Sequence, residues 1–294
     1  MTVVADPRVQ PRVVVKRVRA ERTLSPRRLG LAVAGYLVAL IFLLPYVEMV
    51  ISALRPANEL LGRNYVPKHF DWSNFTSLWS TGFGANLGAS LQIAAGSTVL
   101  VLLVALPAGY YTARHRFRGR ALFLLLVLAT QMFQPAAMLV GIQREFTSFA
   151  LPSPLLSLIL VNAGFNMAFA VWILNAYFSS IPYELEQAAM VDGTTRLGAV
   201  VRITLPLTMP GVVTAVIFTF ISAWNELLVA LTLTGGASSS AVPLTVAINN
   251  YIGQYSIDWG HLFAASVIST LPVIVLFAFI EGKVVGGLTA GSIK

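Results

Sequence analysis

Glu226 is the residue whose chemistry stands out, because its ionisable carboxyl interrupts a long apolar stretch beside Trp224 and Asn225. A charged group in such surroundings is costly and usually faces a cavity or a partner. An aromatic face, an amide and a carboxylate together would suit a path for a polar solute. The alternative is that Asn225 and Glu226 hydrogen-bond a neighbouring helix or lie near a membrane interface.

A second polar group lies in another apolar stretch, where Asn162, Phe165 and Asn166 are three and four positions apart. Residues at that spacing share one face of a helix. They could line the same solute path, or the two amides could form hydrogen bonds between helices. Both interpretations stay open on the sequence alone.

The sequence gives little support for a catalytic site or a metal site. The chain contains no cysteine, which excludes disulfides and thiolate metal ligands. His69, His115 and His261 do not have the spacing of metal ligands. No cluster suits catalysis, and no glycine-rich phosphate loop of the type Gly-x-x-x-x-Gly-Lys-Ser/Thr occurs. We therefore predict neither a catalytic nor a metal site, and no bound cofactor.

Composition places these residues in a membrane protein. The chain is 56% hydrophobic and 11% charged, whereas a soluble domain carries roughly 25% charged residues. Helices are the open-ended way to satisfy backbone groups in lipid, so we predict an all-α polytopic fold. Six apolar stretches approach the roughly 20 residues that cross a bilayer. They are residues 29–54, 87–113, 121–143, 155–178, 205–233 and 262–285.

The basic residues predict the orientation of these spans. Most of the 20 lysines and arginines lie in residues 1–28, in the loops between spans two and three and between four and five, and near the C-terminus. Such residues stay in the cytoplasm, so both termini are predicted to be cytoplasmic. The opposite side holds Arg55, Arg63, Lys68 and Arg144. Residues 1–28 lack the apolar core of a signal peptide and are predicted to be a basic tail before a membrane domain of residues 29–294. Because the net charge of +8 gathers beside the spans, we expect contact with membrane lipid and not with nucleic acid.

A short polar segment, residues 179–206, separates spans four and five. Pro182 suits the start of a helix, and Glu184 and Glu186 favour the positive end of its dipole. Gly193 allows a turn, and residues from about 195 to 204 predict a second short helix. We interpret this segment as a docking element for a soluble partner; the alternative is an ordinary amphipathic connector.

The spacing in this segment resembles the EAA loop of ABC importer permeases. Gln187-Ala188-Ala189 is followed after three residues by Gly193, and after nine more by Ile203-x-Leu-Pro206. Further marks resemble the carbohydrate-uptake branch, similar to the smaller membrane subunit of the maltose system. They are Trp224-Asn225-Glu226, Trp259 with Ala264-Ala265, Leu271-Pro272 and the ending at residues 287–294. The resemblance covers roughly residues 30–294.

The resemblance implies an assembly in a prokaryotic cell membrane. A second permease subunit, usually different in sequence, would pair with this chain, and two ATPase subunits would carry ATP and Mg²⁺. An extracytoplasmic binding protein would deliver a sugar. The residues expected to couple to the ATPase are Glu184, Glu186, Gln187, Ala188, Ala189, Asp192, Gly193, Ile203 and Pro206.

One residue departs from the family pattern, since the usual glutamate before Ala188-Ala189 is Gln187 here. Glu186 is about 100° away around a helix and cannot simply replace it. Any charge at the ATPase contact would then come from Glu184, Glu186 or Asp192, or be absent. The alternatives for the whole chain are a similar permease for a polyol, oligosaccharide or glycerol phosphate, or a secondary transporter with Glu226 as its ion-coupling carboxylate.

Overall fold

The computed structural model describes residues 26–56, 59–60, 69–148, 153–235 and 242–290. The predicted tail lies outside these residues as far as residue 25. The described helices are α1 (Pro26–Ala53), α2 (Ser73–Leu78), η1 (Trp79–Thr81), α3 (Phe83–Arg114), α4 (Arg120–Ala129), η2 (Thr130–Met132), α5 (Pro135–Ser148), α6 (Pro154–Ser180), α7 (Glu184–Val191), α8 (Arg196–Ala199), η3 (Val200–Thr204), α9 (Leu205–Leu207), α10 (Met209–Trp224), α11 (Leu228–Thr234), α12 (Leu244–Asn249) and α13 (Trp259–Ala290).

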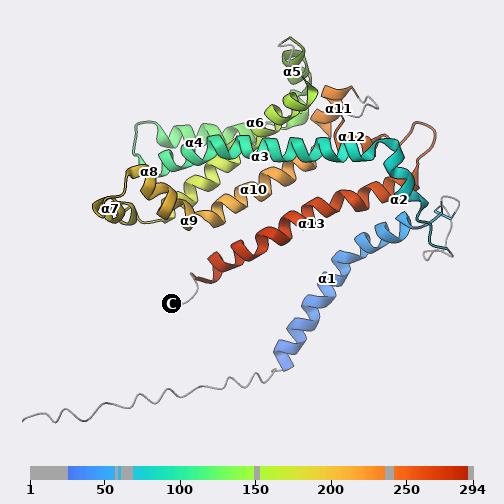
Figure 1. Cartoon of the computed structure of the whole chain (residues 1–294), viewed down its shortest axis with the longest axis horizontal. Helices are drawn as coiled ribbons and strands as arrows, with labels where there is room; N and C mark the ends of the chain where they lie inside the picture. The colour runs from blue at the N-terminus through green and yellow to red at the C-terminus, as the bar shows by residue number, and fades with distance from the viewer. Residues whose placement is uncertain (1–25, 57–58, 61–68, 149–152, 236–241, 291–294) are drawn as a thin grey trace, which may run out of the picture. The chain divides into compact units, whose positions relative to one another are not determined.

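The chain divides into two units, residues 1–47 and 48–294. The first contains most of α1, a helix with Pro45 inside it. The second contains every other helix, and all features discussed below belong to it. Within the second unit, Figure 1 shows α7 and α8 at one end of the long helix α3 and α11 and α12 toward the other.

The all-α membrane architecture is confirmed. Four helices of the described residues are long and apolar enough to span a bilayer, and two bent helix pairs raise the number to six if each pair is one span. The third predicted span bends by 94° between η2 and α5, before Pro135. Proline cannot continue the hydrogen-bond ladder of the preceding turn, which accounts for the break at this position.

The fifth predicted span, residues 205–233, is not one continuous helix. The segment from Arg196 to Leu207 meets α10 at an angle of 71°, and α10 then ends at Trp224. With 16 residues, α10 is about 24 Å long, which is shorter than the roughly 30 Å hydrocarbon core of a bilayer. The apolar sequence continues through the break into α11, so hydropathy alone could not reveal it.

Helix α3 is central to the second unit, because it contributes buried residues to all three hydrophobic clusters. Its buried positions are mostly small, among them Ala89, Ala94 and Ala105. Small residues let helix backbones approach closely in a membrane protein, where close packing drives association. The sequence of α3 is therefore suited to a helix that is covered by neighbours along its length.

Helix α3 approaches the backbone of α6 closely near the α7 end. A Cβ atom added to Gly109 would lie 2.9 Å from Leu174 Cβ and 3.2 Å from the backbone nitrogen of Asn175. One turn away, Asn175 Nδ2 donates a hydrogen bond of 2.8 Å to Thr112 Oγ1. Helix α10 joins the pair in the same way, since a Cβ on Gly211 would meet the ring of Tyr177 at 2.4 Å. Helices α3, α6 and α10 thus form a tightly packed block.

We predict that Gly109→Ala destabilises this block. The added methyl group meets backbone atoms that cannot move without shifting a helix, so the expected cost is about 1–3 kcal/mol. The matched control is Gly164→Ala in α6, where a Cβ meets nothing within 4 Å and alanine favours the helix over glycine. Thermal unfolding of the detergent-solubilised protein measures both. Equal stability of the two variants would contradict the close α3–α6 contact.

Candidate functional site

The 179–206 segment folds as a helix, a turn and a second helix, as predicted. Helix α7 begins at Glu184 with Glu184 and Glu186 in its first turn. Gly193 adopts a φ of +88°, a left-handed conformation that favours glycine. Thr195 then caps α8 by accepting a hydrogen bond of 3.1 Å from Gly198 N. The predicted second helix is correct in position, although its later part, η3, is a π-helix.

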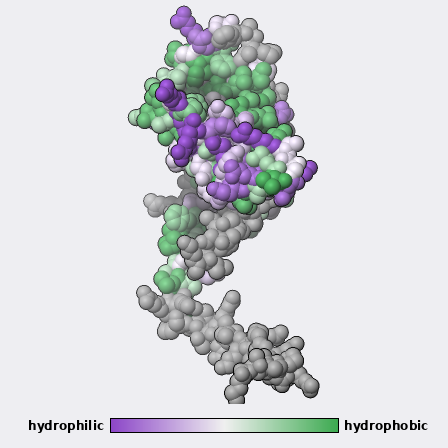
Figure 2. Space-filling view, turned by 90° about the vertical axis from the view of Figure 1, so that its left-hand side faces the viewer, coloured by the Kyte–Doolittle hydropathy of each residue, from purple (hydrophilic) through white to green (hydrophobic). Residues whose placement is uncertain are grey.

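One face of this segment is open to solvent. Gln187, Ala188, Asp192 and Gly193 are exposed. Two apolar side chains stand out beside them, Val191 at 87% and Leu197 at 73% exposure. Figure 2 looks at this end of the molecule and shows that hydrophilic residues gather on it, with apolar residues around them. Large apolar side chains exposed within a polar surface are typical of a protein-binding site.

The remaining predicted coupling residues are placed differently. Glu184 and Pro206 are exposed, Ile203 is half-buried, and Ala189 is buried against the segment itself. Of the nine residues proposed for a contact, Ala189 and Glu186 are the two that the structure buries. The small side chain of Ala189 therefore allows close packing within this chain. Ala188 is the alanine of the pair that is exposed on the surface.

Glu186 is not part of the exposed face, because its carboxylate is buried within this chain. Its side chain is 1% exposed and accepts four contacts from this chain. Oε2 accepts a hydrogen bond of 2.7 Å from the Tyr110 hydroxyl. Oε1 accepts 2.8 Å bonds from Arg114 Nε and Thr204 Oγ1, and Arg114 Nη2 lies 2.7 Å away in an ionic contact without hydrogen-bond geometry.

Arg114 holds a position that the sequence did not reveal. The sequence uses the basic residues of this loop only to predict orientation, but the side chain of Arg114 is only 6% exposed. Its Nη1 donates a 2.7 Å hydrogen bond to the carbonyl of Ile181, just after α6. Its guanidinium carbon lies 5.6 Å from the centre of the Tyr183 ring. The available signal was the four-residue spacing of Tyr110 and Arg114, which places both on one face of α3.

At the opposite end of the block, Glu226 caps a broken helix. Its carboxylate accepts backbone hydrogen bonds of 2.7 Å from Val229 N and 2.9 Å from Ala230 N, in the first turn of α11. Its own carbonyl accepts a 2.8 Å bond from Thr245 Oγ1 in α12. These bonds satisfy backbone groups where α10 ends and α11 begins. Glu226 therefore has a structural partner for each oxygen of its carboxylate.

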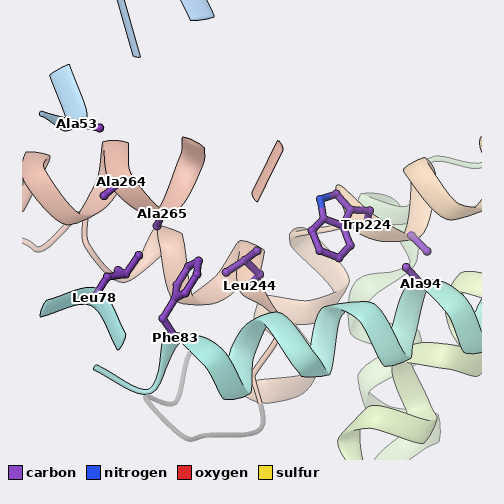
Figure 3. Packing of buried hydrophobic residues seen from close by; sticks show 9 residues of the cluster. Ala53, Leu78, Phe83, Ala94, Trp224, Leu244, Ala264 and Ala265 are labelled. Carbon is purple, nitrogen blue, oxygen red and sulfur yellow. The ribbon is translucent and has the colours of Figure 1, made fainter. Parts of the chain in front are cut away.

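Trp224, predicted for the solute path, is buried within this chain. Its side chain is packed in a cluster with Phe83, Ala94 and Leu244, and the residue is 5% exposed. Figure 3 shows Trp224 among these residues. The indole Nε1 donates a 3.2 Å hydrogen bond to the carbonyl of Ser269 in α13. Trp224 thus fastens α10 to α13, while its neighbour Asn225 is exposed.

The polar residues of α6 also serve the chain itself. Asn162 Nδ2 donates to Leu158 O at 2.9 Å, and Asn166 Nδ2 donates to Asn162 O at 2.8 Å. Both are bonds within α6, so the hydrogen bonds between helices that we considered are not present at these amide nitrogens. Phe165 is half-buried and packs against a neighbouring cluster.

Asn162 and Glu226 nevertheless meet at one small pocket. It is lined by Ser90, Ile93, Leu158, Asn162, Ala223, Glu226, Ala230 and Pro243. The space open to the centre of a water molecule is about 10 Å³, which is room for about one water. A sugar ring does not fit such a space. The pocket brings two predicted residues together without forming a solute site within this chain alone.

Together, the fold and the site describe a helical membrane protein with an exposed, partly apolar surface at one end of α3. The family of binding-protein-dependent transport system inner membrane components matches residues 105–284. The chain belongs to that family.

Characterised relatives extend the match over most of the chain. The trehalose/maltose transport system permease protein MalG of Thermococcus litoralis is 31% identical, over 91% of this chain and 97% of its own length. The diacetylchitobiose uptake system permease protein DasC of Streptomyces coelicolor is also 31% identical, over 85% of this chain and 91% of its own. A solved bacterial ABC transporter that imports the polysaccharide alginate supports the fold, with a TM-score of 0.72 over 87% of this chain and 96% of its own at 23% identity.

We predict that Glu226→Ala destabilises the protein by about 0.5–2 kcal/mol, because two backbone N–H groups of α11 lose their acceptor. Glu226→Gln keeps one carbonyl oxygen and should be intermediate. Asn225→Ala is the matched control, since Asn225 is exposed. Thermal unfolding of the purified complex measures the three variants. A Glu226→Ala protein as stable as Asn225→Ala, but without transport, would assign the carboxylate to the solute instead.

Proposed function

We propose that this chain is one of two permease subunits in an ATP-driven, binding-protein-dependent sugar importer. The observation that carries the proposal is the 179–206 segment, whose exposed surface lies at one end of the α3–α6–α10 block. A separate ATPase, which holds ATP and Mg²⁺, would dock there. The importer would lie in a prokaryotic cell membrane with both chain termini in the cytoplasm, as the distribution of basic residues favours.

The sugar class rests on the relatives. Their names include trehalose, maltose and diacetylchitobiose, and a further relative is named for the transport of sulfoquinovosyl glycerol. These solutes share sugar rings, so we infer a sugar or sugar derivative as the substrate. A pocket with room for about one water favours a solute path completed by the second permease subunit, with delivery by a soluble binding protein.

The secondary-transporter alternative loses its main support. It needed an ion-coupling carboxylate within the membrane, and Glu226 was its strong candidate. The two oxygens of that carboxylate accept backbone bonds from α11, which gives the residue a structural reason to be there. We therefore infer coupling to ATP hydrolysis on another subunit.

The docking surface also accommodates Gln187. Gln187 is exposed on α7, where its amide can form neutral hydrogen bonds with a partner. With Glu186 buried, the acidic groups left to such a contact are Glu184 and Asp192, both exposed. We infer a contact that depends on shape and apolar area at Val191 and Leu197 more than on an ion pair.

Substitution of Gly193 tests the docking surface. We predict that Gly193→Leu lowers ATPase retention and transport, because a non-glycine residue in the left-handed region costs about 1–2 kcal/mol and the new side chain occupies the exposed turn. Gly193→Asn should retain most ATPase, since asparagine tolerates this conformation. Co-purification of the ATPase with the detergent-solubilised permease is the measurement. Full ATPase retention and transport by Gly193→Leu would sink the docking proposal.

A further inference from the structure

The Arg114–Glu186 pair connects α7 with α3, η3 and the residue that follows α6. Glu186 lies in α7 and Arg114 in the last turn of α3. The same carboxylate oxygen also receives Thr204 of η3, and Arg114 reaches the end of α6 through Ile181 O. Both arms of the segment thus meet at one carboxylate, which is bound to α3 through Tyr110 and Arg114, and Arg114 also binds the carbonyl that directly follows α6.

We propose that Arg114 and Glu186 are positioning residues that make the 179–206 segment move as one rigid body with α3 and α6. This inference rests on the proposed function, in which an ATPase moves the segment. The pair would transmit that motion to the helices that line the solute path. Its role is distinct from docking, because side chains that are 6% and 1% exposed are out of reach of a partner.

The geometry explains why an arginine suits this task. Nε and Nη2 approach one oxygen of Glu186, at 2.8 and 2.7 Å, while Nη1 binds the Ile181 carbonyl at 2.7 Å. A planar guanidinium fixes the direction of all three contacts at once, whereas an ammonium is a point charge on a flexible stem. The guanidinium group of Arg114 therefore sets the orientation of α7 relative to the ends of α3 and α6.

Without this pair, the segment would have a place to pivot. The segment has three other connections to the block: it continues directly from the end of α6, Arg196 Nη2 of α8 lies 3.0 Å from His115 Nε2 at the end of α3, and α9 leads into α10 at a bend of 71° around Thr208. Thr208 Oγ1 bonds to Thr204 O and Leu205 O, at 2.9 and 3.0 Å, all on the segment's side of the bend. Motion of a docked ATPase could be absorbed at this bend unless the carboxylate and guanidinium hold the segment to α3.

Variants of the pair separate a coupling role from a merely structural one. Removing one partner leaves a buried charge without compensation, whereas replacing both by apolar residues is often neutral for stability. The test therefore uses Glu186→Gln, the double variant Arg114→Met with Glu186→Met, and the control Arg118→Met. Arg118 is an exposed arginine in the loop that follows α3. Each is purified as the full complex with its ATPase and binding protein and is reconstituted in liposomes.

We expect both pair variants to keep the ATPase bound while solute transported per ATP falls by about fivefold or more, the low end of coupling between distant sites. Arg118→Met should transport as much solute per ATP as the wild type.

A second measurement follows the position of the 179–206 segment directly. Because the chain has no cysteine, spin labels can be placed at Leu103→Cys on α3 and Arg202→Cys on η3. Their distance should not change with ATP in the wild type and should change or broaden in the pair variants.

Two results would overturn the inference. One is a pair variant that transports as much solute per ATP as the wild type and shows an unchanged distance between the spin labels. The other is failure of both pair variants to assemble, which would reduce the pair to a folding element. Failure of the proposed function is distinguishable, because then even the wild-type permease would not retain an ATPase.

Discussion

The need to satisfy every backbone polar group without water shapes this molecule. In a bilayer, each helix break leaves N–H and C=O groups that must find a partner inside the protein. Glu226 supplies acceptors at the start of α11, and Ser90 Oγ accepts from Leu244 N at the start of α12 at 2.7 Å. Polar side chains inside the apolar sequence are therefore used first to make broken helices possible.

Polar side chains have different roles at the two ends of the block. Near α11 and α12, polar side chains form hydrogen bonds with the backbone of this chain. The pocket beside them has room for about one water. At the α7 end, a buried carboxylate network holds the 179–206 segment from inside and leaves its outer face open. The small residues of α3 allow the tight packing that joins both ends. The proposed coupling to an ATPase would require such a stiff connection between the 179–206 segment and the rest of the block.

The sequence predicted what depends on local pattern. Hydropathy located four spans that are single helices, Gly193 located the turn at φ +88°, and the 100° separation of Glu186 from Gln187 correctly indicated that the two side chains have different surroundings. It could not predict what depends on tertiary contacts. The end of α10 at Trp224 is hidden because apolar residues continue past it, and the burial of Arg114 depends on where α7 folds back against α3. A buried carboxylate and an exposed one look identical in a sequence, and here only packing separates Glu186 from Glu184.

Site-specific crosslinking in the intact complex tests the central claim, that an ATPase binds the exposed face of the 179–206 segment. The chain has no cysteine, so a single cysteine can be placed at Val191, which is 87% exposed, or at Tyr255, which is 94% exposed and lies in the loop before α13. With a thiol-to-amine crosslinker, Val191→Cys should capture the ATPase subunit, and Tyr255→Cys, predicted to face the opposite side of the membrane, should not. Capture of the ATPase at Tyr255 and not at Val191 would contradict both the docking surface and the predicted orientation.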